Sequence, residues 1–585
     1  MKKLIYLITI LFSIAVLSGC EDFLDTQTFT KKDSNSFPKT ADDANQMLTG
    51  VYAVMNLIFD NDYGSSYFMV AELASDDRFG GGGANDKQWQ AMNHLLYTDR
   101  NQYKDFWAHH YLGVSRATAT IAALQSMEEG DLKNQKLGEA KTLRAFFYFE
   151  LVQLLGDVPL MTEAPENVSQ ALESPPQTPQ KDIFKQIGTD LWEAASTMPS
   201  VSWNTYPSGT ITKWTAEGLL ARVWLFYTGF YGETTLPIEG GEITSAQVAA
   251  ALKDCIDNSG HDLVPDYRSL WTYTNSVTKP DYPYAKDAPT WVRDGSNIEQ
   301  VFVMKHIGLN DWDGTLLRFT NQFALAFGVR NPTGIDESHR YADVFPLGQG
   351  WGAGPVSTTL WNEWVTDEPN DPRRKASIYN VADEASKDYK FGGDSQMEET
   401  GLWQKKIVAT TAYGGQQDDG LYWSFFSAPA YEGYTGDNFQ VGNAADIALI
   451  RFSDILLMQS EVTKTADGMN RVRARAGLPP VAYSDNALRN ERRHELAFEG
   501  LRWGDIRRWG IAQQALNKMY NTPIYNSGTA TTMKPQGSAG DVATRYQVTK
   551  GFFIIPQDEI DLAAGALKQN AGWEGTDATF ISFAN

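Results

Sequence analysis

The chain has 585 residues, of which 42% are hydrophobic and 21% charged, so its composition is that of a folded globular protein and not of a disordered one. A formal net charge of −22 disfavours binding to a nucleic-acid backbone, and it disfavours adsorption to an anionic lipid surface by charge alone. The two cysteines form neither a CxxC motif nor a Cys/His zinc pattern, which excludes a structural metal framework of that kind.

The first residues have the form of a secretion signal. Lys2 and Lys3 precede an almost wholly apolar run over residues 4–17, which is short for a bilayer span and has the length of a secretory h-region. The run ends in a segment similar to the lipobox of bacterial lipoproteins, Leu17, Ser18, Gly19 and Cys20. In a lipoprotein, residues 1–19 are removed and acyl chains on Cys20 hold the protein on a membrane. The alternative is an ordinary signal peptide with an incidental cysteine.

An acidic start after Cys20 and polar sequence to about Pro38 predict a tether over residues 20–39. If Cys20 is acylated, Cys255 has no disulfide partner. Cys255 lies in an Ala-rich helical pattern and is interpreted as a small buried hydrophobic residue.

Residues 40–264 have the spacing of amphipathic helices. Thr40 and Asp43 resemble a capping box ahead of an apolar stripe. Two apolar stripes over 137–154 predict a helix that is covered on two sides and ends at Gly156. Further helices are predicted around 183–191, 214–227 and 248–256, with Trp214 and Trp224 in the core.

Residues 265–440 are rich in Gly, Pro, Asn, Asp and aromatic residues, with a short β-like run at 300–304. Loops of this extent are usually functional, and the region is predicted to pack on the helical part without forming a domain of its own. Helical spacing returns over 441–585, with helices predicted at 452–462, 469–476 and 488–498. Helices with two apolar faces suggest neighbouring pairs that bury one another, so the expected fold is mainly α.

Four blocks, in their order along the chain, resemble the SusD/RagB family of outer-membrane nutrient-binding lipoproteins. They are the lipobox with its acidic start at 20–25, the run 143–151 with 156–160, the run 491–509, and the tail 554–560 ending in Gln569 and Asn570. The resemblance implies tetratricopeptide-like helix pairs that carry a large, irregular, loop-rich ligand-binding region.

The resemblance also implies a function. Such a protein is lipid-anchored in the outer membrane, faces the cell exterior and is not an enzyme. It captures an oligosaccharide or polysaccharide, or in some members a peptide, and delivers it to a SusC-like TonB-dependent transporter. No cofactor and no nucleic-acid partner are expected.

The charged residues of the third block could be mistaken for paired catalytic acids and bases. At helical spacing they are better interpreted as an ion-pair network that holds the C-terminal helices. These residues are Arg492, Arg493, Glu495, Glu499, Arg502, Asp505 and Arg508.

The expected ligand site consists of loop-borne aromatic rings beside polar residues, because rings cover the apolar faces of sugars while polar side chains bind the hydroxyls. The resemblance favours Asp77, Arg78 and Trp89 in the first long loop. The other candidates are Trp271, Tyr284, Trp312 and Trp351, and a further aromatic stretch covers 413–434. Any single ring more often packs under its own loop, so the prediction is that a few of these rings converge on one exposed platform.

A surface glycoside hydrolase and a RagB-like peptide binder are the alternatives. With 72 acidic residues a pair of carboxylates is always available, and the GxSxG, HExxH and P-loop motifs are absent. His109 and His110 are interpreted as packing or surface residues, and residues 310–314 lack the first ligand and the terminal Glu of a calcium loop. The many Trp residues mildly favour a sugar.

Overall fold

The computed structural model describes residues 38–59, 66–163, 175–293, 295–309, 311–330, 344–384, 389–417, 420–426, 439–536, 540–575 and 578–583. The fold is mainly α-helical, as the sequence predicts, with two-stranded antiparallel sheets between the helices. The predicted signal and Cys20 lie outside the described residues. Within the described ranges, no helix combines the length and the apolar character needed to cross a membrane.

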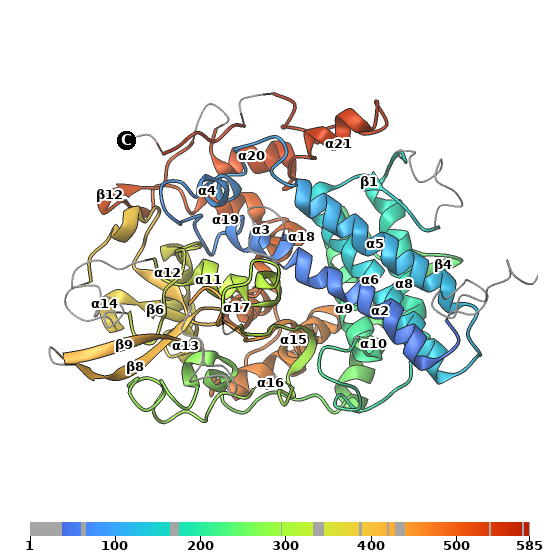
Figure 1. Cartoon of the computed structure of the whole chain (residues 1–585), viewed down its shortest axis with the longest axis horizontal. Coiled ribbons are helices and arrows are strands. Elements are labelled where there is room, and N and C mark those ends of the chain that lie inside the picture. The colour runs from blue at the N-terminus through green and yellow to red at the C-terminus, as the bar shows by residue number, and fades with distance from the viewer. Residues whose placement is uncertain are drawn as a thin grey trace, which may run out of the picture.

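Successive long helices of the N-terminal part pack against one another in the manner of tetratricopeptide pairs. α5 contacts α6, α6 contacts α8, α8 contacts α9, and α9 contacts α10, and together they form the right-hand part of Figure 1. These helices, with α2 beside them, are α2 (Ala41–Ile58), α5 (Lys104–Leu124), α6 (Asp131–Leu155), α8 (Gln180–Thr197), α9 (Lys213–Tyr231) and α10 (Ser245–Asn258).

Local sequence explains the ends of these helices. The Thr40 hydroxyl accepts a hydrogen bond from the Asp43 N–H, and the Asp43 carboxylate accepts one from the Thr40 N–H, which confirms the predicted capping box. α6 stops at Gly156, whose φ of +75° favours glycine. Along its second half α6 is buried on all sides, because α5 and α8 cover it.

The C-terminal helices complete the same hydrophobic core. α15 packs on α10 and α18 packs on α9, so one cluster of buried apolar side chains extends from Val51 to Phe580. Trp214, Trp224 and Cys255 lie in this cluster, as predicted. The helices are α15 (Phe452–Thr463), α16 (Asp467–Arg475), α17 (Asp485–Leu496), α18 (Arg502–Arg508), α19 (Ala512–Asn517), α20 (Val542–Thr549) and α21 (Gln557–Leu562).

The less regular elements lie mainly on the left of Figure 1. β5 (Gln300–Met304), at the predicted β-like run, pairs with β10 (Ile447–Arg451) and so ties the loop-rich region to the C-terminal helices. The short helices are α3 (Tyr67–Leu73), α4 (Lys87–Asn93), α11 (Gln322–Phe327), α12 (Thr358–Asp367), α13 (Pro372–Ser377) and α14 (Val381–Glu384). The other paired strands are β1 (Val158–Pro159) with β2 (Gln177–Thr178), β3 (Leu236–Ile238) with β4 (Gly241–Ile243), β6 (Ile378–Asn380) with β7 (Leu402–Gln404), β8 (Thr410–Gln417) with β9 (Gly420–Phe426), and β11 (Pro523–Asn526) with β12 (Thr529–Thr532).

Buried ion pairs join the C-terminal helices to one another, which confirms the predicted network. The Arg492 guanidinium lies 2.7 Å from the Asp454 carboxylate and 3.0 Å from that of Asp505. The Arg508 guanidinium contacts both Asp505 and Glu461, at 2.8 and 2.6 Å. Arg493, Glu495, Glu499 and Arg502 also have charged partners in the network. Since these groups already neutralise one another, their role is to hold the fold together.

Candidate functional site

The first long loop, which follows α3, is buried. The Asp77 carboxylate accepts a hydrogen bond from Arg493 at 2.7 Å, and that of Asp76 accepts one from Arg502 at 2.7 Å. Burial alone would raise the pKa of Asp76, but the two guanidiniums hold it below its ordinary value, whereas burial dominates at Asp77 and raises its pKa. The two carboxylates therefore fasten this loop to the C-terminal helices.

Arg78 lies in the core, with none of its side chain exposed. Its guanidinium is 2.5 Å from the Glu72 carboxylate and is sandwiched between the rings of Phe327 and Phe498, at 4.1 and 4.7 Å from their centroids. A buried charge needs partners of this kind. The structure thus corrects the prediction for Asp77 and Arg78, because both are engaged in holding the loop and neither faces a surface that a ligand could reach.

Trp89, on α4, lies beneath the glycine run of the same loop, and only 2% of it is exposed. A Cβ at Gly80 would lie 2.5 Å from the Cα of Gln90, and a Cβ at Gly82 would lie 2.8 Å from the Trp89 ring. The glycines are therefore needed so that the backbone can lie flat on α4. The buried Trp89 ring packs beneath the loop. The prediction that this ring faces a ligand is therefore corrected.

The rings of Trp271 and Tyr284 lie against two buried lysines. The Lys406 Nζ lies 4.9 Å from the Trp271 ring centroid and 2.7 Å from a Glu499 carboxylate oxygen. The Lys405 Nζ lies 4.6 Å from the Tyr284 ring centroid. Burial lowers the pKa of Lys406 to about 8, although Glu499 acts in the opposite direction. These rings stabilise charges that the fold has removed from water. The prediction for Trp271 is corrected because its ring is buried, whereas Tyr284 is half-buried and stays a prediction.

Trp312 and Trp351 remain accessible, and so in part does Tyr284, whereas the other four candidates are buried. Trp312 lies in the loop between β5 and α11, and 54% of it is exposed, while Trp351 is half-buried. Two further apolar side chains of the same loop, Ile307 and Leu316, are exposed by 47% and 39%. We call this surface the aromatic loop face and define it by Ile307, Trp312, Leu316, Phe319, Trp351 and Phe439. Apolar groups gathered in this way mark interaction sites.

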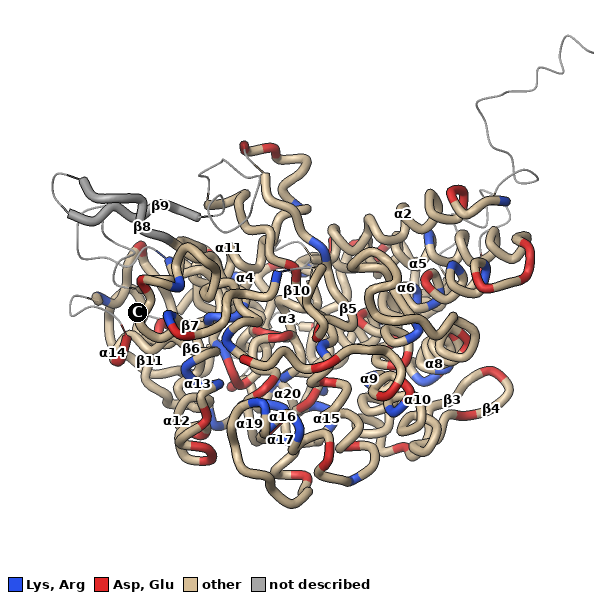
Figure 2. The backbone as a smooth tube through the Cα atoms, turned by 90° about the horizontal axis from the view of Figure 1, so that it is seen from below, with Lys and Arg blue, Asp and Glu red and all other residues tan. Residues whose placement is uncertain are grey.

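Backbone hydrogen bonds hold the two tryptophans in one neighbourhood. Leu309, in the Trp312 loop, donates its N–H to the Val441 carbonyl at 2.9 Å. Two residues before Val441, the Phe439 ring packs edge-on against Trp351, with 5.7 Å between the ring centroids. α11, which follows the loop, lies on the same side of the molecule as α2, at the top of Figure 2. The loop that carries Trp312 is thus hydrogen-bonded to the segment whose Phe439 ring contacts Trp351.

A cleft of about 400 Å³ lies beside the aromatic loop face. Its walls are α2, the turn 208–210, the end of β5 and Phe319. Tyr52 on α2 contributes an aromatic ring, and its hydroxyl is fixed because it donates to Glu139 at 2.9 Å and accepts from the Ile211 N–H at 3.0 Å. Apolar walls with a few fixed polar groups are typical of a ligand site.

His306 anchors the base of the Trp312 loop, since its backbone N–H donates to the Asp446 carboxylate at 2.9 Å. Burial lowers the pKa of its imidazole to about 3, and the nearby Lys305 ammonium acts in the same direction. The folded protein therefore resists protonating His306, whereas the unfolded chain accepts a proton below its ordinary pKa of about 6.5. Stability contributed by neutral His306 is thus lost as the pH falls from about 6.5 towards 3.

We expect His306→Phe to reduce this acid sensitivity. Between about pH 7 and pH 5 the free energy of unfolding should fall by about 2 kcal/mol less in the variant than in the parent. Urea unfolding at the two pH values measures the difference. An equal fall in both proteins would contradict the assignment.

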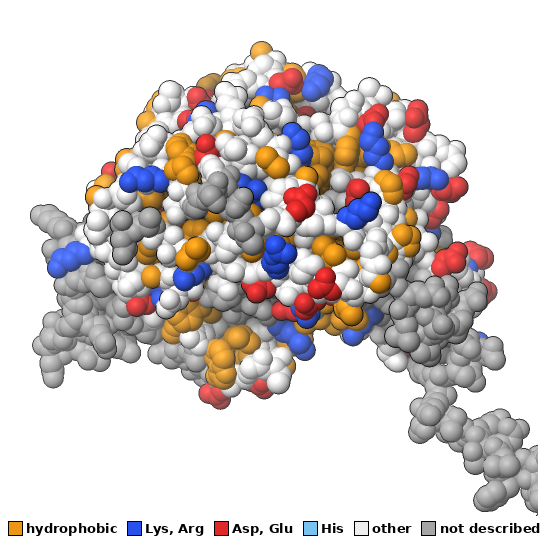
Figure 3. Space-filling model, turned by 90° about the horizontal axis from the view of Figure 1, so that it is seen from above, with side chains coloured by type: hydrophobic (Ala, Val, Ile, Leu, Met, Phe, Trp, Pro, Cys, Tyr) orange, Lys and Arg blue, Asp and Glu red, His pale blue; other side chains and the backbone are white. Residues whose placement is uncertain are grey.

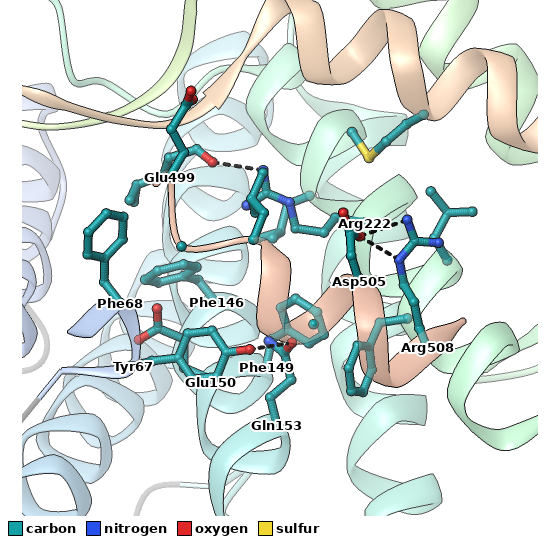
Figure 4. Close-up of a pocket in the computed structure, with 18 of the residues that line it drawn as sticks. Tyr67, Phe68, Phe146, Phe149, Glu150, Gln153, Arg222, Glu499, Asp505 and Arg508 are labelled. Carbon is teal, nitrogen blue, oxygen red and sulfur yellow. Dashed lines mark hydrogen bonds and ion pairs between the residues drawn. The ribbon is translucent and has the colours of Figure 1, made fainter. Parts of the chain in front are cut away.

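The cavity drawn in Figure 4 lies between α6, α9 and α18 and has a volume of about 60 Å³. Inside it, the Tyr67 hydroxyl donates to Gln153 at 2.8 Å, and Arg508 donates to Asp505 at 2.8 Å. A space of this size holds a few water molecules and no sugar ring. Its polar groups belong to the ion-pair network of the core.

Several members of the site had no signal in the sequence. Tyr52 lies in an apolar helical stripe whose spacing predicts burial in the core. Phe319 and Phe439 are isolated aromatic residues in irregular segments. Phe439 is identified by its ring contact with Trp351, and Tyr52 and Phe319 are identified by their place in the lining of the cleft. The aromatic side chains predicted over 413–434 lie outside the described residues. Among the described residues, no group of three or more His, Cys, Asp or Glu is arranged to hold a metal ion.

Two family models match this chain. Residues 334–573 match the SusD family, and residues 22–225 match a family described as starch-binding and associating with the outer membrane. SusD-like protein P2 of Formosa agariphila is 23% identical over 542 residues, which cover 88% of this chain and 92% of that protein.

Solved structures share the fold. A laminarin-binding SusD-like protein superposes with a TM-score of 0.65 at 24% identity, over 92% of this chain and 100% of that one. Surface glycan-binding protein A from Bacteroides thetaiotaomicron, in complex with laminarihexaose, gives a TM-score of 0.62 at 20% identity, over 90% of this chain and 99% of that one.

Proposed function

We propose that this chain, which belongs to the SusD/RagB family, binds an oligosaccharide or polysaccharide at its aromatic loop face and does not cleave it. The bound glycan is then delivered to a SusC-like TonB-dependent transporter. The chain is held on the outer membrane, facing the cell exterior, by acyl chains on Cys20. The description of one matching family as associating with the outer membrane supports this location.

The observation that carries the proposal is the exposure of Trp312, at 54%, among other exposed apolar side chains of one loop. Leaving such a ring in water forgoes the free energy of its burial. An indole is flat and apolar, so it matches the C–H face of a sugar ring, and polar side chains beside it can bind the hydroxyls. Two structural relatives are named for laminarin and laminarihexaose, which makes a laminarin-type glucan the first ligand to test.

One carboxylate of the Trp312 loop, that of Asp313, lacks the character of a catalytic acid. Glycoside hydrolysis needs a carboxylic acid with a raised pKa opposite a second carboxylate. The Asp313 carboxylate instead accepts hydrogen bonds from the Thr315 hydroxyl and N–H, at 2.7 and 2.8 Å. These bonds lower its pKa, so Asp313 is ionised and unsuited to act as the acid.

The side of the molecule at the top of Figure 1 carries α20 and α21 and is viewed face-on in Figure 3. Figure 3 shows acidic, basic and hydrophobic side chains interspersed over the region of α20 and α21.

Native affinity electrophoresis tests the proposal. Residues 21–585 are run in gels that contain laminarin, starch or other polysaccharides, and the length of each glycan is measured afterwards. Retardation by at least one polysaccharide with unchanged glycan length is the expected result. Shortened glycan would favour the glycoside hydrolase alternative. No retardation by any polysaccharide would contradict glycan binding and favour the RagB-like peptide binder.

A further inference from the structure

A second hollow, of about 250 Å³, lies between the α8–α9 connection, β5 and the segment after α10. We propose that it is a separate saccharide site, which holds one neutral sugar ring between Trp203, Tyr206, His261 and Asn297. The class of ligand rests on the proposed function, but the residues of this hollow are different from those that define the aromatic loop face.

The lining of this hollow is uncharged among the residues that the structure describes, although the chain as a whole has a net charge of −22. His261 is its one titratable group near neutral pH, and burial lowers the pKa of that imidazole to about 4, so His261 is neutral. A lining of hydroxyl, amide and aromatic groups suits a ligand that is itself neutral and rich in hydroxyls.

One wall presents both a hydrogen-bond donor and an acceptor. The Nδ1 of neutral His261 lies 2.7 Å from the Ile298 carbonyl oxygen, so Nδ1 carries the proton and Nε2 is an acceptor. The Oδ1 of Asn297 accepts from the Glu299 N–H at 3.0 Å, which leaves its amide as a donor. A sugar hydroxyl both donates and accepts, and this pair matches it.

Trp203 supplies a half-buried indole at the rim, held in a fixed position. The His261 ring lies 5.8 Å from it, centroid to centroid. On the backbone side, a Cβ at Gly260 would lie 3.3 Å from the indole, and the φ of Gly260 is +76°. The ring is therefore oriented before any ligand arrives, as stacking on a sugar requires.

Two side-chain hydrogen bonds to backbone carbonyls hold the loop that carries Trp203 and Tyr206. The Trp214 indole N–H donates to the Val201 carbonyl at 2.7 Å, and the Gln135 side-chain amide donates to the Ile211 carbonyl at 2.9 Å. A preformed loop loses little conformational freedom on binding.

The size and position of the hollow limit what it can hold. Its volume is below the roughly 300 Å³ at which sites for drug-sized ligands begin, so it suits one ring. It shares Ser208, Gly209, Thr210, Phe302 and Val303 with the cleft beside the aromatic loop face. A glycan that reached both places would gain affinity from the link between them.

Fluorine NMR of the whole mature chain labelled with 5-fluorotryptophan tests the proposal. Trp203→Phe assigns the Trp203 resonance, and the titration is repeated in a Trp312→Ala, Trp351→Ala background. The probes are glucose, laminarihexaose and maltohexaose. We expect a saturable shift of the Trp203 resonance in both backgrounds. Tyr206→Ala should raise the Kd for that shift at least about tenfold, and Trp361→Leu, a tryptophan change on α12, should leave it unchanged.

A Trp203 resonance that no probe moves in either background would overturn the proposal. This outcome differs from failure of the aromatic loop face. If the aromatic loop face does not bind glycan, retardation in the polysaccharide gels does not depend on Trp312, and the Trp203 resonance still shifts. If only the hollow beside Trp203 does not bind sugar, retardation depends on Trp312 and the chemical shift of the Trp203 resonance does not change.

Discussion

Replacing Trp312 with alanine is expected to weaken binding of the retained polysaccharide at least about tenfold while leaving the melting temperature unchanged. The ring has no packing role that would make its removal costly to the fold, since 54% of it is exposed. Its loss removes the largest flat apolar surface of the aromatic loop face. Isothermal titration calorimetry with a defined oligosaccharide gives the change in Kd, and thermal unfolding gives the change in stability.

Trp361→Ala is the matched control for Trp312→Ala. Trp361 is a half-buried tryptophan on α12, which lies at the bottom of Figure 2, away from the aromatic loop face. We expect its affinity to equal that of the parent. Equal affinity of Trp312→Ala and the parent for every retained glycan would exclude Trp312 from the site.

Arg451→Met is expected to lower the free energy of unfolding by about 3–5 kcal/mol. The Arg451 guanidinium is 2% exposed and binds the carboxylates of Glu299, Glu495 and Glu499, all of which are buried. Methionine fills much of the same space but carries no charge. It therefore leaves buried carboxylates short of a cation, which is the costly way to break an ion pair.

The control for this variant is Arg471→Met. Arg471 is 41% exposed and pairs with Asp262, which is 57% exposed, so solvent screens the pair and its loss should cost less than about 1 kcal/mol. Urea unfolding followed by circular dichroism compares both variants with the parent. A similar small effect for Arg451→Met and Arg471→Met would show that the buried network contributes little to stability.

Local sequence patterns predict much of the helical fold because they depend on neighbours in the chain. The capping box of Thr40, the end of α6 at Gly156 and the strand at 300–304 all follow from residues within a few positions. The ion-pair interpretation of 491–508 is also confirmed, but local spacing accounts for only part of it. Arg508 pairs with Asp505 three positions earlier, whereas Arg492 pairs with Asp454 on α15 and Arg493 pairs with Asp76 in the first long loop. The boundaries at 264 and 440 stay predictions, and the pairing of β5 with β10 crosses the second of them.

The site could not be predicted residue by residue because burial depends on partners far along the chain. Asp77 looks like an exposed loop carboxylate until Arg493, more than four hundred positions later, folds against it. Trp271 lies in a segment with loop composition, and its ring is buried against Tyr267 and beside Lys406, which is more than a hundred positions later. Trp312 and Trp351 could not be told from such residues by composition. Their exposure appears only when the surrounding segments are in place.

A crystal structure of the mature chain with the oligosaccharide selected by the gels tests the central claim most directly. The account predicts a sugar ring stacked on the Trp312 indole, with the glycan chain running over the aromatic loop face towards Trp351. A well-defined glycan bound elsewhere, with both indoles left free, would contradict it.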